Sequence, residues 1–445
     1  MTRALRAACA AASLVAGMAN AQQYPAGFGP NPALPKPEKS LLPTVNVAKA
    51  EPWPDGTAPI PAAGLRATAY ASGLQHPRWL YVLPNGDVLV AETNRPPKET
   101  EGIREAVMAA AMKRAGAAAP APHQITLLRG VDASGKAVLR TVFLKGLASP
   151  FGMALVGNDL YVANAHELLR FPYKEGDTSI SASGTRVAAL PAGINHHWTK
   201  SLVASPDGKK LYVGVGSNSN VAEKGMAIEE GRAAIWEFDR ASGKGRIYAS
   251  GLRNPVGMAF HPQSRKLWVA VNERDELGND LVPDYMTSVR EGGFYGWPYS
   301  YFGKNVDERV KPQRPDLVAR AIVPDYALGA HTASLGLAFY DGKLLRQYAG
   351  GALVGQHGSW NRDPYSGYKL VFVPFANGAP SGPPQDVLTG FLSKDGKAYG
   401  RPVGVAVDRQ GAILLADDVG NIIWRVTPAG AAGVPGAVTA TGGKQ

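Results

Sequence analysis

Apolar and polar positions follow one recurrent pattern along most of the chain. Each copy has a polar loop, an apolar strand, a turn rich in Pro, Asp and Gly, and a second apolar strand. Six copies are found, at Gly73–Thr93, Gly146–Ala163, Ile194–Gly216, Gly251–Val271, Ala330–Gln347 and Tyr399–Ala416. Recurrence of one supersecondary unit is typical of repeat architectures. Two strands per copy, with weaker strands between the copies, predict one four-stranded propeller blade for each copy.

The sequence therefore predicts an all-β fold, a six-bladed β-propeller over residues 64–428. The copies are unevenly spaced, so loops of variable length must connect the blades. One such segment, residues 95–124, is a helical insertion in the first blade. Its helix is expected within residues 102–115, where Ile103, Val107, Ala110 and Ala111 share one face. Two roles are open for this helix, the wall of a binding cleft and a surface decoration.

The ends of the chain have a different composition. Residues 1–21 combine basic residues, a short apolar run and the small-residue sequence Ala19-Asn20-Ala21, which predicts a secretory signal peptide. We expect a secreted protein, with the periplasm as its compartment. Residues 22–63 are rich in Pro and Ala and predict an extended N-terminal arm, with Leu41, Leu42 and Trp53 on the propeller surface. Residues 429–445 predict a flexible tail.

Charge and cysteine content narrow the classes of partner. The only cysteine, Cys9, lies in the signal peptide, so the mature chain has no disulfide and no cysteine-ligated metal. The formal net charge of +11 comes from scattered residues, without a basic run interleaved with aromatics, which argues against nucleic acid. It weakly favours an anionic ligand or cofactor. No apolar run after the signal peptide is long enough for a membrane span, and no Gly-rich nucleotide motif or Gly-x-Ser-x-Gly elbow is present.

The polar loop that opens each copy is the candidate functional feature. In a propeller, the loops entering the innermost strands converge on one face around the central channel. Five of the six loops carry reactive side chains; these are Gln75, His76, His196, His197, Arg253, Asn254, His331 and Arg401. Singly, such residues cap strand ends; at one structural position in several copies, they favour a site. A histidine there is a natural general base near neutral pH, and Arg253 suits a developing oxyanion or a carboxylate.

Two further segments have an unusual composition. Glu273–Pro298 concentrates carboxylates in a loop punctuated by Gly and Pro. Oxygen ligands in a flexible backbone suit Ca²⁺, although a solvated acidic loop explains the composition equally well. Gly355–Arg362 holds Trp360, Asn361 and Arg362, which suit either a flat aromatic ligand or packing between blades.

Four of these motifs, taken together and in order, resemble a known family. They are His197–Leu202, Gly251–Phe260, the acidic loop ending in Gly292–Pro298, and Gly400–Val407. In these stretches the chain resembles the soluble pyrroloquinoline quinone (PQQ)-dependent sugar dehydrogenases, and most closely the glucose/sorbosone dehydrogenase group. The resemblance covers residues 65–428. It implies a six-bladed propeller with the quinone at the mouth of the channel.

The resemblance also implies roles for individual residues. His197 would be the general base that removes the substrate hydroxyl proton, while hydride passes from the adjacent carbon to C5 of the quinone. Arg253 would stabilise charge on the quinone carbonyl. The further cofactor contacts implied are Asn254, Asn272, His331 and Arg401.

Calcium is implied in the same way. One Ca²⁺ would bind the quinone and polarise it as a Lewis acid, with the backbone carbonyls of Glu273 and Arg274 as its ligands. A second, structural Ca²⁺ would involve Asp280 or Asp284 and the carbonyl of Tyr295.

The chain departs from the glucose enzymes of this family at particular positions. His196 stands where they have an Asp before the catalytic histidine. Ser217, followed by Asn218, stands where they have an Asp that orients it. A quinone-contacting Lys has no match near residues 357–360.

On this reading, the protein is a secreted dehydrogenase that uses PQQ and Ca²⁺ to oxidise an aldose or a related aldehyde of the sorbosone type. Its partners would be a sugar substrate and an external electron acceptor. Two other classes stay open. A metal-dependent lactonase-type hydrolase would recruit Glu92, Asn94, Asn164 and Asn254 around one buried cation. A non-catalytic binding propeller would make His197 dispensable.

Overall fold

The computed structural model describes residues 24–38, 44–96 and 103–430. The predicted signal peptide, Leu41, Leu42 and the tail from residue 431 lie outside these residues. Within the described part of the chain, no helix combines the length and the apolar character needed to cross a membrane.

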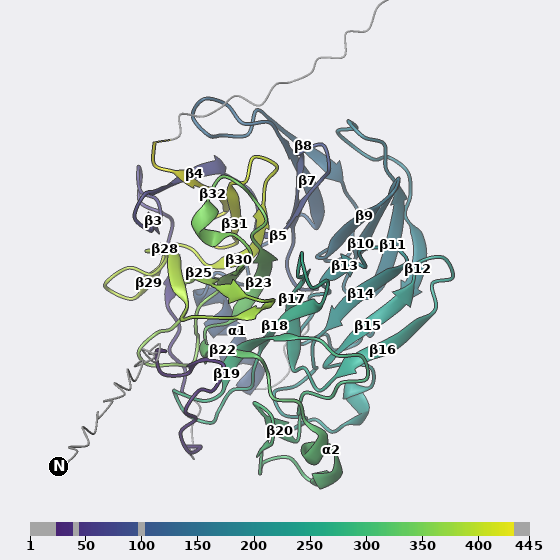
Figure 1. Ribbon diagram of the computed structural model, residues 1–445, viewed down its shortest axis with the longest axis vertical. Helices are drawn as coiled ribbons and strands as arrows, with labels where there is room; N and C mark the ends of the chain where they lie inside the picture. Colours follow the sequence, from purple (N-terminus) through teal and green to yellow (C-terminus); the bar gives the residue numbers. More distant parts are fainter. Residues whose placement is uncertain (1–23, 39–43, 97–102, 431–445) are drawn as a thin grey trace, which may run out of the picture.

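Six antiparallel sheets surround a central axis (Figure 1), which confirms the predicted six-bladed β-propeller. The first blade contains β5 (Pro77–Val82), β6 (Val88–Glu92), β7 (Gln124–Arg129) and β8 (Leu139–Leu144). The second contains β9 (Met153–Val156), β10 (Asp159–Ala163), β11 (Glu167–Pro172) and β12 (Thr185–Ala189). The third contains β13 (Leu202–Ala204), β14 (Lys210–Val215), β15 (Ala234–Asp239) and β16 (Gly245–Ser250).

The remaining blades follow in chain order. The fourth contains β17 (Asn254–Phe260), β18 (Leu267–Asn272), β19 (Pro283–Ser288) and β22 (Tyr326–Ala330). The fifth contains β23 (Ser334–Phe339), β24 (Ala352–Gln356), β25 (Lys369–Val373) and β28 (Gln385–Thr389). The sixth contains β30 (Pro402–Val407), β31 (Ile413–Asp417), β32 (Ile422–Pro428) and β4 (Leu65–Ala71). Because β4 precedes the first blade in the sequence, its pairing with β32 closes the ring between the two ends of the chain.

Short elements decorate this frame. The N-terminal arm adds β1 (Phe28–Gly29) to β22 and β3 (Ile60–Pro61) to β28. Its β2 (Lys49–Ala50) pairs with β29 (Lys397–Ala398). The others are α1 (Ile103–Arg114), α2 (Pro315–Arg320), the 3-10 turns η1 (Ala227–Glu229) and η2 (Arg346–Tyr348), and the small hairpins β20 (Ser300–Tyr301) with β21 (Asn305–Val306) and β26 (Phe375–Ala376) with β27 (Ala379–Pro380).

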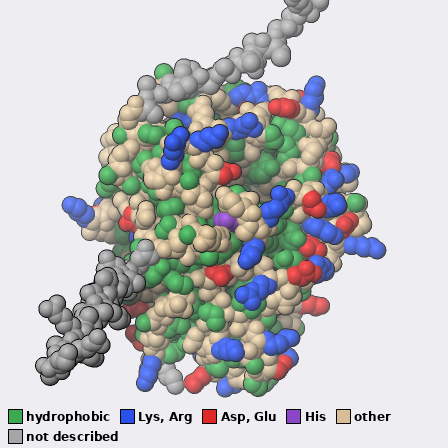
Figure 2. All heavy atoms as spheres, viewed as in Figure 1, with side chains coloured by type: hydrophobic (Ala, Val, Ile, Leu, Met, Phe, Trp, Pro, Cys, Tyr) green, Lys and Arg blue, Asp and Glu red, His purple; other side chains and the backbone are tan. Residues whose placement is uncertain are grey.

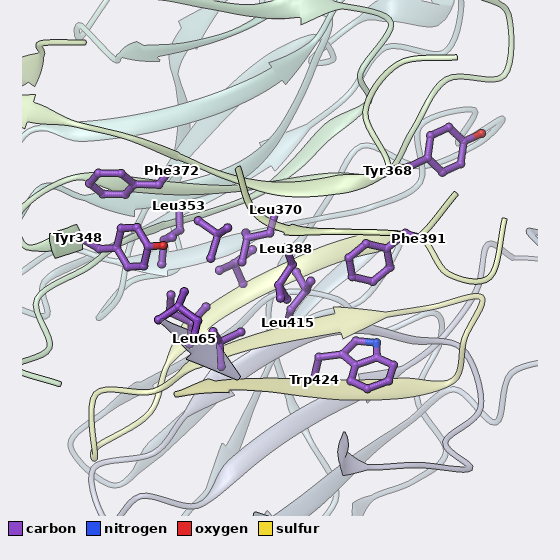
Figure 3. Close-up of a cluster of buried hydrophobic side chains, with 14 of the residues drawn as sticks. Leu65, Tyr348, Leu353, Tyr368, Leu370, Phe372, Leu388, Phe391, Leu415 and Trp424 are labelled. Carbon is purple, nitrogen blue, oxygen red and sulfur yellow. The ribbon is translucent and has the colours of Figure 1, made fainter. Parts of the chain in front are cut away.

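The hydrophobic core lies between neighbouring blades. Central strands are buried on both faces, so their residues are apolar in continuous runs such as Ile413–Leu415. Figure 3 shows one such layer between the fifth and sixth blades, where Leu353 and Leu370 lie near Leu415 and Trp424.

The innermost strands approach one another with little room for side chains. In four of them a glycine faces the backbone of the next blade; these are Gly152, Gly257, Gly336 and Gly404. A Cβ atom added at Gly404 would lie 2.7 Å from the carbonyl oxygen of Arg78 and 3.1 Å from Cα of Trp79. These glycines therefore allow direct backbone contact between adjacent blades.

Replacing Gly404 by Ala should force the first and sixth blades apart and lower the free energy of unfolding by about 2 kcal/mol. Gly430 is the matched control, because a Cβ there would meet no atom within 4 Å, and its change to Ala should stay within about 0.5 kcal/mol. Denaturant unfolding followed by circular dichroism measures both. Equal stability of the two variants would contradict the role assigned to the glycine contact.

Candidate active site

The start of each innermost strand and the end of its neighbour lie at the same edge of the blade. Their pairing places Pro77 opposite Glu92, Asn254 opposite Asn272, and Pro402 opposite Asp417. The predicted polar loops therefore share this edge, the mouth of the propeller, with the residues that follow the second strands. One face of the molecule shows a histidine side chain near its middle, with Lys and Arg side chains nearby (Figure 2).

His197 is held at the mouth in a defined tautomer. Its Nδ1 lies 2.8 Å from the backbone oxygen of Ser217 and 3.1 Å from the Ser217 hydroxyl. A carbonyl oxygen only accepts, so Nδ1 carries the proton and Nε2 of the neutral ring has the free lone pair. Burial lowers the pKa of His197 well below its usual range, and the charge of Arg253 acts in the same direction. The ring is therefore neutral at neutral pH and suited to accept a proton.

The backbone around His197 is closely packed. A side chain on Gly216 would overlap both Cβ of His197 and the amide oxygen of Asn254, so both residues pack against Gly216. The buried Arg232 donates from Nη2 to the His197 carbonyl at 3.0 Å and from Nε to the Gly216 carbonyl at 2.9 Å. The position of the predicted base is thus fixed by neighbours from the third and fourth blades.

Arg253 lies within a dense network of acceptors. It donates to the carbonyl of Glu273 at 2.6 Å, to both oxygens of Asn220, and to Oδ2 of Asp275 at 3.1 Å. These four bonds occupy four of the five N–H groups of a guanidinium. Burial favours the neutral form of Asp275, but the charge of Arg253 together with His331 and Asn361 outweighs it and lowers the pKa of Asp275 to about 2.

His331 joins the same carboxylate from the fifth blade. Its Nδ1 is 3.5 Å from Oδ1 of Asp275, and its Nε2 is 2.9 Å from the carbonyl oxygen of Gly278. Burial disfavours the charged ring, but the hydrogen bond and the charge of Asp275 outweigh it and raise the pKa of His331. Arg253, Asp275 and His331 therefore form one charged cluster that joins the fourth and fifth blades.

A second cluster surrounds Asp418. Its buried carboxylate contacts Nη1 of Arg78 at 2.5 Å and Nε2 of His357 at 3.0 Å, with Nε2 of His76 at 3.7 Å. Burial lowers the pKa of His357 to about 4. The positive and imidazole groups outweigh burial and hold the pKa of Asp418 far below its usual range. Arg78 also lies over the ring of Trp198, so this cluster reaches from the first blade to the third.

Arg401 differs from the other mouth arginines in its partners. It is 2% exposed, donates to the carbonyl of Gly358 and the hydroxyl of Tyr368, and stacks on the Tyr368 ring at 4.8 Å. Among the described residues no carboxylate pairs with its guanidinium, and its Nε has no partner. A buried cation without an anion is costly, so an anionic ligand would be stabilised beside it.

These features fit the cofactor implied by the resemblance. PQQ is a flat ortho-quinone that carries several carboxylates, and Arg401 is a cation without an anionic partner. Asn254 has a buried amide oxygen without a partner, whereas its Nδ2 lies 3.4 Å from the amide oxygen of Asn272. The structure thus places five residues at the mouth, the same five that the resemblance implied as contacts of PQQ. They are Arg253, Asn254, Asn272, His331 and Arg401.

The side chains of the residues predicted to hold calcium have partners within the protein. The buried Asp284 accepts from the backbone N–H of Glu273 and Ser334 and from the Thr332 hydroxyl, and burial raises its pKa to about 6. The Asp280 side chain is 68% exposed and pairs with Arg362. The other three are also engaged. The Glu273 carboxylate and the Arg274 guanidinium pair at 2.9 Å, and the hydroxyl of Tyr295 donates to the Ser288 carbonyl.

A calcium site built from these side chains therefore does not fit. In the described part of the chain, no group of three or more His, Cys, Asp or Glu residues is arranged to hold a metal ion.

Two residues of the ligand set of the hydrolase alternative have partners within the protein. The Glu92 carboxylate accepts hydrogen bonds from the backbone N–H of Gln75 and the hydroxyl of Thr126 within the first blade. The Asn94 amide donates to the carbonyls of Ala117 and Ala119 and anchors the helical insertion. Of these four residues, Asn164 and Asn254 keep buried amide oxygens without partners.

The sequence motifs gave Arg78, His357 and Asp418 no role, and placed Asp275 only within the acidic loop. His357 and Asp418 directly follow a second strand, Asp275 lies three residues after one, and Arg78 is the second residue of an innermost strand. The hairpins of the repeats could have predicted the position of Asp275, His357 and Asp418, because an antiparallel pair brings the end of one strand beside the start of the other.

The N-terminal arm runs along the mouth. Its residues hydrogen-bond to three mouth loops: Glu38 N–H to the Leu277 carbonyl, Asn46 N–H to the Trp360 carbonyl, and Trp53 Nε1 to Asp417 at 2.9 Å. The Trp53 ring packs on Phe391, Tyr399 and Trp424. The helical insertion rests on the same arm, where Gly116 lies close to Ala50 and Val419.

Two relatives are similar to this chain in sequence. An uncharacterised protein of Borreliella burgdorferi is 30% identical over 294 residues, which cover 63% of this chain and 76% of the relative. A pyrroloquinoline quinone-dependent pyranose dehydrogenase of Coprinopsis cinerea is 26% identical over 303 residues, or 54% of this chain. The chain spans only 41% of the Coprinopsis protein.

Two solved structures share the fold. The holo form of the PQQ domain of pyranose dehydrogenase from Coprinopsis cinerea has a TM-score of 0.66 at 21% identity, covering 86% of this chain and 100% of that one. A calcium structure of the Trichoderma reesei Carbohydrate-Active Enzymes Family AA12 protein has a TM-score of 0.67 at 19% identity, covering 87% and 99%.

A family description matches residues 59–291 and 315–429, which include strands of all six blades. The resemblance to PQQ-dependent sugar dehydrogenases that the motifs indicated is thereby confirmed. The chain belongs to the TrAA12-like family.

Proposed function

We propose that this protein is a PQQ-dependent dehydrogenase that oxidises an aldose or a related aldehyde of the sorbosone type, in its hemiacetal or hydrate form. The observation that carries the proposal is His197, a neutral imidazole with a defined Nδ1–H tautomer, placed at a mouth lined by Arg253, His331 and Arg401. The names of the Coprinopsis relative and structure support the cofactor and the substrate class. Reduced cofactor would pass its electrons to an external acceptor.

In this proposal, one residue accepts the substrate proton and others stabilise negative charge. When bound, PQQ supplies an electron-deficient carbon that accepts hydride. His197 takes the proton of the substrate hydroxyl at Nε2, and the Ser217 carbonyl holds Nδ1–H while the ring becomes charged. Arg253, fixed by Asp275 and Asn220, offers positive charge where negative charge develops. Arg401 would hold a carboxylate of the cofactor, with His331 as a further contact at the mouth.

Secretion into the periplasm is part of the same proposal. Its support is the basic and apolar segment of residues 1–21, which ends in Ala19-Asn20-Ala21.

Reconstitution tests the function directly. The protein with added PQQ and Ca²⁺ should bind the quinone and reduce a dye when aldoses are present. His197→Ala should lower kcat by about a thousandfold while quinone binding, read by fluorescence quenching, persists. His166→Ala is the matched control, since that side chain is 49% exposed. Absence of quinone binding would contradict the proposal, and full activity of His197→Ala would exclude it as the base.

The pH dependence follows from the lowered pKa of His197. The base works when neutral, so a pKa below about 6.5 keeps kcat/KM high through mildly acidic pH. We expect the acid limb of the wild-type profile below that value. Ser217→Asp would place an anion beside Nδ1, stabilise the imidazolium and move the limb upward by about one unit. A wild-type limb at or above 6.5, or a downward shift in the variant, would contradict this assignment.

Calcium belongs to the proposal as an ion held by backbone carbonyls, and its support is the calcium structure of the Trichoderma protein. Chelation with EGTA should weaken quinone binding about tenfold, and added Ca²⁺ should restore it. Asp280→Asn should not alter the calcium requirement, because that carboxylate is exposed and paired with Arg362. Quinone binding that is unchanged in EGTA would remove calcium from the proposal.

A further inference from the structure

A buried carboxylate that the mechanism above does not use lies close to the predicted base. Glu229 ends the 3-10 turn η1 and is 4% exposed. Its Oε2 accepts the backbone N–H of Asn218 at 2.7 Å, and its Oε1 accepts the hydroxyl of Ser219. Both donors belong to the buried turn of residues 217–219, which follows β14 and also binds the ring of His197.

A single peptide group lies between the carboxylate and the ring. The carbonyl of Ser217 and the N–H of Asn218 belong to the same trans peptide unit, so they point in opposite directions. The carbonyl accepts Nδ1–H of His197 at 2.8 Å, and the N–H donates to Glu229 at 2.7 Å. Because hydrogen bonds in series polarise one another, a carboxylate on the N–H makes the carbonyl a stronger acceptor for the ring proton.

The side chains of the same turn add a second connection. The hydroxyl of Ser217 donates to the carbonyl of Ser219 at 2.7 Å, so its oxygen is left to accept from the ring nitrogen 3.1 Å away. The hydroxyl of Ser219 donates in turn to Glu229. The amide oxygen of Asn218 accepts the backbone N–H of His196 at 3.3 Å, which ties the turn to the loop of the base.

Positive groups surround the base, and Glu229 offsets part of their effect. After burial, the charges of Arg253, His196 and Arg232 lower the pKa of His197. Arg232 donates to the His197 carbonyl at 3.0 Å, and its charge also acts on Glu229, where it opposes the rise in pKa that burial causes. Among the described residues, no carboxylate is paired with the His197 ring itself. Glu229 is therefore the anion that reaches the ring, through the peptide group.

We propose that Glu229 is a positioning residue for His197, which it orients and stabilises in the charged form through the peptide group between Ser217 and Asn218. The inference rests on the proposed function, in which His197 takes the proton of the substrate hydroxyl at Nε2. No proton passes along the path to Glu229, because Nδ1 keeps its own proton throughout. The carboxylate acts on the charge that develops on the ring.

The first measurement uses the full chain without added cofactor. Glu229→Gln keeps the size of the side chain and removes its charge, and Glu230→Gln is the matched control because its neighbouring side chain is exposed. The proton on Nδ1 of His197 is followed by NMR in protein labelled with ¹⁵N in the histidine rings, and His197→Ala identifies its signal. A weaker acceptor deshields this proton less. The signal should therefore move upfield in Glu229→Gln and stay in place in Glu230→Gln.

Kinetics of the reconstituted enzyme supply the second measurement. Glu229→Gln should lower kcat about tenfold and leave KM and quinone binding unchanged. The acid limb of kcat/KM should move downward by about half a unit, because the charged ring loses the anion that favours it. A role in packing alone would lower the activity at every pH without moving the limb.

Two results would overturn the inference: an Nδ1 proton signal that is the same in Glu229→Gln and Glu230→Gln, or an acid limb that stays in place or moves upward. If Glu229→Gln does not fold, Glu229→Asp decides, because it withdraws the carboxylate by one methylene group. Its Nδ1 signal should also move upfield, and an unchanged signal would overturn the inference.

The two measurements separate this inference from the proposed function. An upfield shift in a protein that binds no PQQ would uphold the coupling of Glu229 to His197 and reject the oxidation. Sugar oxidation that requires His197, with an unshifted signal in Glu229→Gln, would do the reverse.

Discussion

The backbone contact between neighbouring innermost strands is the constraint on which this molecule depends. At Gly152, Gly257, Gly336 and Gly404, the space that a side chain would need is occupied by the next blade. Little room is left for side chains at that level of the ring, so the polar groups gather at the edge above it. The contact also positions chemistry, because Gly404 touches the carbonyl of Arg78, whose side chain then reaches Asp418.

The distribution of charge at the mouth reconciles two opposing needs. An anionic cofactor favours positive charge, whereas a general base must stay unprotonated. Asp275 and Asp418 each hold one arginine and at least one histidine, so much of the positive charge is fixed inside the protein. Arg401 keeps no carboxylate partner among the described residues and is left for an anion. The charge of Arg253 also helps to keep His197 neutral. One guanidinium therefore adds positive charge that favours an anionic cofactor and at the same time disfavours protonation of the histidine.

Much of the fold could be predicted from the sequence, because five of the six copies coincide with the inner two strands of a blade. The fifth copy, Ala330–Gln347, contains β23, but its expected second strand reaches the 3-10 turn η2, and the true second strand β24 follows at Ala352–Gln356. The convergence of His197, Arg253, His331 and Arg401 followed from their equivalent positions in those copies. The acidic composition of Glu273–Pro298 was a weaker basis for predicting a calcium site. The side chain of Asp284 lies inward among backbone donors and that of Asp280 lies outward, a difference that only tertiary packing decides. The bond from Trp53 to Asp417 joins residues 364 positions apart, beyond the reach of any local pattern.

The arm and the ring are subject to different constraints in this chain. Residues of the repeats, such as His197 and Arg253, stand at positions set by the geometry of the blades. The arm precedes the repeats, and yet it borders three mouth loops and forms one wall of a cavity lined by Ala330 and Thr332. A segment outside the repeats can change in sequence without disturbing the contacts between blades. Under the proposed function, the arm is therefore the segment that can adapt the surroundings of the mouth, while the ring would hold the base and the charges in place.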